Sequence, residues 1–151
     1  MLPRATKRLE KEAQDIQVNF KDAFDLEIDG DTGLLWRVKF TGAEGTVFSG
    51  EKFTLQFKFD QNYPIEAPEV IFVGAHIPEH PHIYSNGYIC LSTLYDDWTP
   101  SLKVSAVVLS ILSMLSSCPA KGRPVNDKSF TSFANGRSPK SFSWDFEDET
   151  C

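Results

Sequence analysis

Three stretches of the chain alternate apolar and polar residues with a period of two, and this alternation restricts the fold more than any other feature. They cover residues 24–29, 34–40 and 53–59. Such alternation is typical of β-strands that bury one face and leave the other in water. A turn at residues 30–33 and a glycine-rich connection at 41–50 join consecutive strands. The pattern therefore predicts an antiparallel meander with one face toward a core.

A short fourth strand is expected at residues 70–73. Pro64 and Pro68 precede it, and proline cannot lie in a central strand because it lacks the N–H group that the ladder requires. Residues 63–67 are therefore expected to form an exposed loop. The apolar side chain of Ile65 at the tip of this loop favours an interaction surface.

An amphipathic helix is expected near the amino terminus. Apolar residues recur there at offsets of four, three and four, and so line one face of a helix: Leu9, Ala13, Ile16 and Phe20. We expect the charged residues among them to face outward: Lys7, Arg8, Lys11 and Glu12.

Two further helices are expected in the second half of the chain. Ser101 is a candidate cap for a helix over residues 104–115, which is apolar round much of its circumference and must be largely buried. Asn126 or Asp127 can cap a shorter helix that ends before Gly136. Together with the strands, these helices predict an α+β fold.

The length of 151 residues, of which 41% are hydrophobic, fits one globular domain. We place this catalytic or binding domain at residues 1–136. From residue 137 the composition changes to Ser, Pro and Lys and then to acidic residues among aromatic ones, so residues 137–151 are expected to form a flexible tail. The net charge of −6 gives no electrostatic support for nucleic acid or for an anionic membrane surface, and protein partners are expected instead.

The three cysteines, Cys90, Cys118 and Cys151, are odd in number and widely spaced. No apolar signal segment stands at the amino terminus, and no run approaches the roughly 18 apolar residues that a membrane span needs. These features favour a soluble protein of a reducing compartment, the cytoplasm and the nucleus.

The run His80-Pro81-His82 to Cys90 holds the strongest candidate for chemistry. Asn86-Gly87 tolerates left-handed backbone, so the chain should reverse there and hold Cys90 rigidly on a short extended segment. An inert buried thiol is the simplest alternative. Zinc binding by His80, His82 and Cys90 is a weak one, since further ligands are lacking. The polar residues gathered around the cysteine favour a reactive thiol.

Four motifs in order resemble the active-site region of the ubiquitin-conjugating enzymes. Tyr-Pro-x-x-x-Pro-x-Val at residues 63–70 precedes His-Pro-His at 80–82, Ile-Cys-Leu at 89–91 and Trp-Thr-Pro at 98–100. The likeness covers about residues 4–135. It implies the ubiquitin-conjugating fold, with a four-stranded antiparallel meander, an amino-terminal helix, a buried central helix and a short carboxyl-terminal helix.

The resemblance also implies the chemistry. Cys90 would accept the carboxyl terminus of ubiquitin from the activating enzyme as a thioester and pass it to a protein amine. No cofactor or metal would be held by this chain. Partners would be ubiquitin, the activating enzyme, RING or U-box ligases and protein substrates. The residues that match contacts with the ligase or the activating enzyme are Lys7, Arg8, Ile65, Trp98 and Pro100.

His82 and Asn86 are the polar candidates beside the thiol. Most of the family has Asn where this chain has His82, and that Asn is proposed to steady the oxyanion. His82 could donate an N–H to the oxyanion, act as a base or only brace the loop, and the sequence leaves these three roles open.

The finer likeness is to the W-type member, which joins ubiquitin to protein amino termini. It rests on His82, Ser92 and the ending Asp-Glu-Thr-Cys at residues 148–151. Ser92 and Arg123 stand at an acceptor gate where lysine-directed members carry acids. Because an α-amine has a pKa near ~7.7 to 8.0 and a lysine near ~10.4, the α-amine has the larger free-base fraction by about two to three powers of ten at neutral pH.

We therefore expect monoubiquitination of α-amines on flexible, disordered amino termini. The alternatives are a lysine-directed enzyme or a carrier of another ubiquitin-like modifier. A non-catalytic binding module of the same fold is a third, although such variants lack the cysteine.

Overall fold

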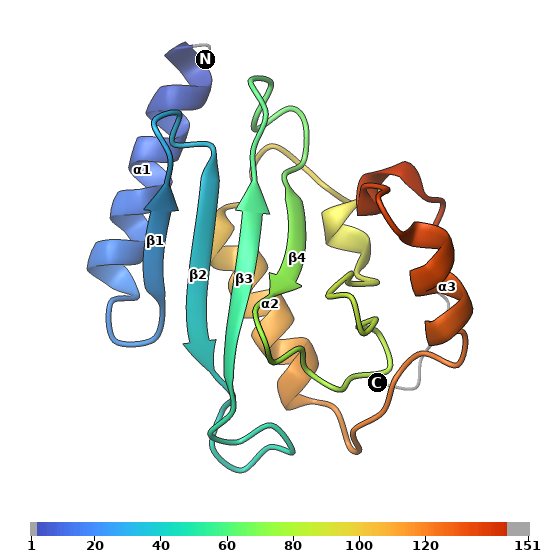
Figure 1. The fold of residues 1–151 in the computed structure, drawn as a ribbon. Helices are drawn as coiled ribbons and strands as arrows, with labels where there is room; N and C mark the ends of the chain where they lie inside the picture. The colour runs from blue at the N-terminus through green and yellow to red at the C-terminus, as the bar shows by residue number, and fades with distance from the viewer. Residues whose placement is uncertain (1–2, 145–151) are drawn as a thin grey trace.

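The computed structural model describes residues 3–144 and shows an α+β fold built on one antiparallel sheet (Figure 1). The strands lie side by side in chain order, and each pairs with the next one: β1 (Asp25–Asp29), β2 (Leu35–Thr41), β3 (Lys52–Lys58) and β4 (Glu69–Val73). The four-stranded meander predicted from the alternation is thereby confirmed.

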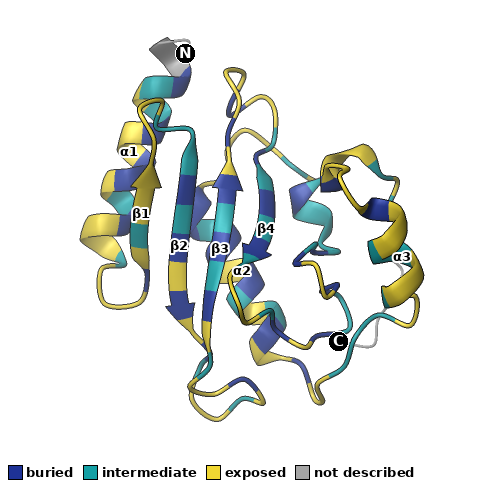
Figure 2. Ribbon diagram, viewed as in Figure 1, coloured by how far each residue is buried: buried dark blue, intermediate teal, exposed yellow. Residues whose placement is uncertain are grey.

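The register of the central strands aligns their buried side chains. Trp36 lies opposite Phe57, and Val38 opposite Leu55, which in turn faces Phe72 on β4. All five are at most 2% exposed. The edge strand β1 is different, because its residues are mostly exposed (Figure 2). The core therefore sits under β2, β3 and β4.

Three α-helices accompany the sheet: α1 (Pro3–Asn19), α2 (Val104–Ser116) and α3 (Asp127–Ala134). In Figure 1, α1 flanks β1, α2 crosses behind the sheet, and α3 stands beyond β4. Most of the apolar residues of α2 are buried, as predicted, although Leu109 is 43% exposed. Within residues 3–144, no helix combines the length and the apolar character that a bilayer crossing requires.

Glu12 does not face outward as the charge pattern predicted. Its residue is only 3% exposed, because it follows Leu9 by three positions and precedes Ile16 by four, which puts it on the buried stripe of α1. Lys7 is exposed as expected. Arg8 is half-buried, and its Nε donates to Glu12 Oε2 at 2.8 Å.

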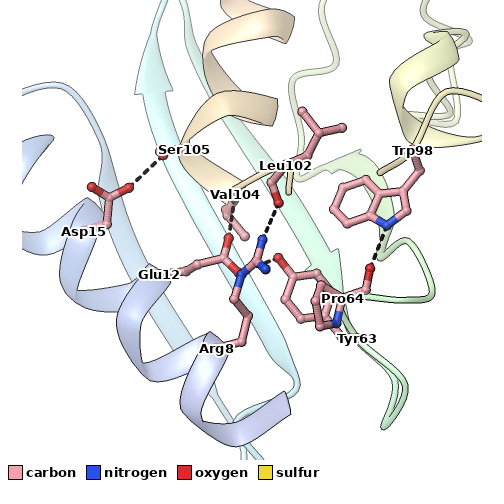
Figure 3. A network of polar contacts seen from close by, with 9 residues as sticks. All are labelled: Arg8, Glu12, Asp15, Tyr63, Pro64, Trp98, Leu102, Val104 and Ser105. Carbon is pink, nitrogen blue, oxygen red and sulfur yellow. Dashed lines mark hydrogen bonds and ion pairs between the residues drawn. The ribbon is translucent and has the colours of Figure 1, made fainter. Parts of the chain in front are cut away.

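The predicted cap of α2 by Ser101 is wrong. The helix begins at Val104, and Ser101 instead lies within hydrogen-bonding distance of Thr99 in the preceding turn, with 3.0 Å between their hydroxyl oxygens. The first N–H of α2, that of Val104, donates to Glu12 Oε1 at 2.6 Å (Figure 3). A carboxylate near a helix amino terminus is favourable there, since it accepts an orphan N–H and offsets the positive end of the helix dipole.

The start of α3 is confirmed at Asp127, and Gly136 follows its end with φ 78°. The side chains proposed as caps have another use, however. Asn126 Oδ1 accepts the Tyr84 hydroxyl at 3.0 Å, and Asp127 Oδ1 accepts the Ser85 N–H at 2.8 Å. These bonds tie α3 to the segment that carries Cys90.

Residues 137–144 are packed against the domain. The Lys140 Nζ donates to the carbonyl of Ala67 at 2.6 Å, and the ring of Trp144 stacks on Tyr95 with centroids 5.0 Å apart. The remainder of the predicted tail, Cys151 included, lies outside the described residues. The domain boundary at residue 136 stays a prediction.

Candidate functional site

Residues 82–90 form a narrow hairpin beside β4. Ile83 pairs with Ile89, and the Cys90 N–H donates to the His82 carbonyl at 2.8 Å. Gly87 turns the chain with φ 94°, and its carbonyl accepts the Phe72 N–H at 2.9 Å. A Cβ at Gly87 would meet the Phe72 oxygen at 2.0 Å, so only glycine allows this approach. The predicted reversal at Asn86-Gly87 is confirmed.

Cys90 is partly exposed on a rigid support. The preceding residue, Ile89, is fully buried and accepts the Tyr95 hydroxyl through its carbonyl at 3.0 Å. Burial raises the pKa of Tyr95, and that of Tyr84 as well, and the charge of the nearby Cys90 adds to both shifts. Both phenols therefore keep their protons at neutral pH, and Tyr84 and Tyr95 add no negative charge near the sulfur.

His82 lies across the hairpin from Cys90 and is partly exposed. Its backbone N–H donates to Nδ1 of His80 at 2.8 Å, and the two imidazole rings meet edge to face with centroids 5.5 Å apart. The backbone of His82 is thus held from both sides. The three roles considered for the His82 ring stay predictions.

His80 is a structural support of the hairpin. It is fully buried; its Nδ1 accepts the His82 N–H, and its Nε2 lies 3.3 Å from the Met114 carbonyl on α2. An Nδ1 that accepts a hydrogen bond cannot carry a proton, so the ring is neutral with its hydrogen on Nε2. Burial lowers the pKa of His80 to about 4.

We expect the protein to lose stability as the pH falls from about 6.5 to about 4. The unfolded chain takes up a proton on His80 near pH 6.5, whereas the folded chain resists until about pH 4, so the contribution is fully present above 6.5. Between pH 7 and pH 5 the loss should be about 2 kcal/mol. Urea unfolding at pH 7 and pH 5 measures this loss in the free energy of unfolding. In His80→Gln the difference between the two pH values should be smaller. Equal pH dependence in both proteins would contradict this assignment.

Asn86 belongs to the turn of the hairpin. It lies at the exposed tip of the hairpin, where its Oδ1 accepts the Tyr88 N–H at 3.1 Å. The Gly87 turn, with φ 94°, lies between it and Cys90. Asn86 therefore shapes the turn, and a catalytic role for it stays a prediction.

The two gate residues both follow the hairpin in sequence, Ser92 by two positions and Arg123 in the loop between α2 and α3. Ser92 starts a short 3-10 helix, η1 (Ser92–Leu94), and its carbonyl accepts the N–H groups of Tyr95 and Asp97. The Arg123 guanidinium is engaged by carbonyl oxygens, among them that of Ile83 at 3.1 Å. Neither position carries a carboxylate, and the gate role of both residues stays a prediction.

The predicted ligase contacts come together in part. The Trp98 Nε1 donates to the Pro64 carbonyl at 2.9 Å, which joins the loop after η1 to the loop before β4 (Figure 3). Ile65 beside it is 61% exposed, and Pro100 is exposed too. Arg8 is turned inward instead, where its Nη2 donates to the Leu102 carbonyl at 2.8 Å.

The described part of the chain offers no set of side chains arranged to bind a metal ion. Among residues 3–144, no group of three or more His, Cys, Asp or Glu side chains is placed to hold a metal ion. His80 uses both ring nitrogens within the protein.

Comparison with known proteins decides the family. A family model described as ubiquitin-conjugating enzyme matches residues 8–146. The chain belongs to the ubiquitin-conjugating enzyme family. It is 49% identical over 150 residues to a probable ubiquitin-conjugating enzyme E2 W of Dictyostelium discoideum, with 99% of each chain covered. It is 52% identical over 116 residues to a probable ubiquitin-conjugating enzyme E2 W-A of Danio rerio, with 77% of this chain and 76% of the relative covered.

Among solved structures, a ubiquitin-conjugating enzyme E2 of Agrocybe aegerita matches with a TM-score of 0.81 and 38% identity. The match covers 90% of this chain and 98% of that one. The ubiquitin-conjugating fold and the likeness to the W-type member are thereby confirmed. This ubiquitin-conjugating enzyme is a transferase that works through a thioester, in a pathway with ubiquitin, an activating enzyme and ligases.

Proposed function

We propose that Cys90 carries ubiquitin as a thioester and that the enzyme prefers α-amines of flexible amino termini as acceptors. Cys90 is the cysteine that fits the first part, because it is partly exposed, whereas Cys118 is buried. The observation that carries the second part is the lack of a carboxylate at the gate positions, which hold Ser92 and Arg123. A protonated lysine meets no carboxylate at these positions to accept its proton.

The two transfer steps balance as thioester exchange and aminolysis. The Cys90 thiolate attacks the carbonyl that links ubiquitin to the activating enzyme, the new C–S bond forms at Sγ, and the activating enzyme leaves as its thiolate. A neutral amine then attacks the same carbonyl and expels the Cys90 thiolate, while the amine proton passes to solvent or to a base. His82, whose backbone carbonyl accepts the Cys90 N–H across the hairpin, is our candidate for that base.

We also propose that a RING or U-box ligase binds the surface formed by Ile65, Trp98 and Pro100. The bond from Trp98 to the Pro64 carbonyl holds the two loops in one orientation, which lowers the ordering cost of binding. Lys7 remains available to the activating enzyme. Arg8 would act indirectly, because its guanidinium is engaged within the domain.

The acceptor preference is tested with two matched peptides. One has a free, unstructured amino terminus and no lysine; the other is acetylated at its terminus and carries one lysine. The enzyme charged with ubiquitin should discharge to the first peptide at least about tenfold faster at pH 7.5, since free-base fractions differ by about two powers of ten. At pH 9 the ratio of the two discharge rates should fall roughly tenfold compared with pH 7.5. The α-amine is then almost fully neutral, while the free-base fraction of lysine is still rising.

Equal discharge to both peptides at pH 7.5 would mean a lysine-directed enzyme and would overturn the preference. Failure to charge with ubiquitin, together with charging by another ubiquitin-like protein, would support the alternative carrier. A peptide sequence placed at the buried amino terminus of a folded protein serves as the control for flexibility and should react slowly.

A further inference from the structure

Arg123 belongs to the loop between α2 and α3 and reaches under the catalytic hairpin. Its Nη2 donates to the carbonyl of Ile77 at 3.0 Å, and its Nη1 donates to the carbonyls of Pro78 and Ile83. The neighbouring Gly122 N–H donates to the Glu79 carbonyl at 3.2 Å. The loop is therefore fastened to the segment 77–83 by four hydrogen bonds.

The three carbonyls that Arg123 binds enclose the His-Pro-His motif from both ends. Those of Ile77 and Pro78 precede His80, and that of Ile83 follows His82. Ile83 is fully buried and pairs with Ile89, the residue before Cys90. The guanidinium thus holds the Ile83 carbonyl, and Ile83 pairs with Ile89, which directly precedes Cys90. A shift of the guanidinium would therefore move the backbone that carries Cys90.

Arginine is suited to this task by its shape. A guanidinium presents five N–H donors in a fixed plane, so it can bond several carbonyls at once, whereas a lysine ammonium is a single point. Among residues 3–144, Arg123 forms no ion pair with a carboxylate, and its hydrogen bonds all go to backbone oxygens. The side chain is thus used to hold backbone, which differs from a role at the acceptor gate.

We propose that Arg123 is a positioning residue for the thioester chemistry: its guanidinium sets the hairpin geometry that aims Cys90 and His82 at the reacting carbonyl. This rests on Cys90 as the carrier of ubiquitin and holds for any acceptor amine. Its loss should lower the rate of transfer and leave the KM for the acceptor peptide unchanged, because the hydrogen bonds of the guanidinium go to backbone carbonyls of this chain.

The test compares Arg123→Lys and Arg123→Gln with the matched control Arg37→Gln. Arg37 lies on β2, where its guanidinium contacts Asp29 and Gln56, outside the hairpin. Thermal unfolding first establishes the temperature at which all variants are folded. Single-turnover transfer from Cys90 to the acceptor peptide is then measured below that temperature, along with hydrogen exchange of the Cys90 amide, which reports its bond to the His82 carbonyl.

We expect both Arg123 variants to transfer roughly ten- to a hundredfold more slowly at saturating peptide, because small misplacements of reacting groups carry penalties of this size. The Cys90 amide should exchange at least about tenfold faster, with amides of α2 unchanged. Arg37→Gln should match the wild type in both measurements. Full rescue by Arg123→Lys would show that charge alone suffices and would overturn the proposal.

Transfer at the wild-type rate by folded Arg123→Gln would overturn it as well. Neither result would bear on the assignment of Cys90 as the carrier of ubiquitin, which Cys90→Ala tests separately. If Cys90→Ala still formed a thioester, the carrier assignment would fail whatever the Arg123 variants did.

Discussion

Cys90→Ala should abolish the reducible ubiquitin adduct completely. A thioester needs a sulfur nucleophile, and alanine offers none at the end of the hairpin. The measurement mixes the enzyme with ubiquitin, the activating enzyme and ATP, and compares gels run with and without a reducing agent. Cys90→Ser should give a slow adduct that survives reduction, because a hydroxyl forms an ester in place of a thioester and is the weaker nucleophile.

The matched control is the second described cysteine. Cys118 is 4% exposed at the end of α2, and its Sγ lies 3.1 Å from the Ala120 carbonyl. Cys118→Ala should charge like the wild type at a temperature where it is folded, although the lost packing destabilises it by about 1 kcal/mol. A reducible adduct on Cys90→Ala that disappears from Cys118→Ala would reverse the assignment.

Glu12→Ala should destabilise the fold by about 3 kcal/mol, because it removes the acceptor of two buried donors and of one half-buried guanidinium. These are the Val104 N–H at the start of α2, the Tyr63 hydroxyl, and the Arg8 guanidinium (Figure 3). Burial raises the pKa of Tyr63, and the charge of Glu12 adds to the rise, so Tyr63 keeps its proton and donates at neutral pH.

Urea unfolding measures this change as a lower midpoint at an unchanged slope. Glu10 is the control, since it is exposed on the same helix, and Glu10→Ala should shift the free energy of unfolding by less than about 0.5 kcal/mol. Glu12→Gln keeps the shape and one acceptor and should fall between the two. A Glu12→Ala protein as stable as Glu10→Ala would refute a structural role for the carboxylate.

The hydrogen bonds of Glu12 also support the surface formed by Ile65, Trp98 and Pro100. Tyr63 stands beside Trp98 with ring centroids 6.0 Å apart, and its next residue supplies the carbonyl that Trp98 binds. Glu12 on α1 therefore supports the loop that presents Ile65. The charges of α1 divide between the interior, with Arg8 and Glu12, and the surface, with Lys7.

The strands were predictable because their information is local. Alternation with a period of two is written in consecutive residues such as 53–59, and short connections leave a meander as the simplest pairing. The turn at Asn86-Gly87 was predictable for the same reason, since left-handed backbone is a property of the dipeptide. The site cysteine followed from its surroundings and from the order of the motifs.

The polar side chains were harder to predict, because their partners come from distant parts of the chain. Ser101 had the right residue type for a cap, yet Glu12 from α1 occupies that place. Asn126 and Asp127 are bound to the hairpin, and Asn86 is bound within its own turn. A polar group takes the partner that packing brings within reach, and sequence spacing does not reveal that partner.

The sequence by itself thus determined the strand order, the buried helix and the cysteine on its tight turn, because backbone preference and apolar periodicity act over a few residues. Only the tertiary structure decided which charges are interior. Glu12 caps a helix that begins 92 residues later, and Arg123 holds carbonyls 40 to 46 residues away. Burial makes an unpaired polar group costly, so those partnerships are set by the completed core and by nothing local to the residues themselves.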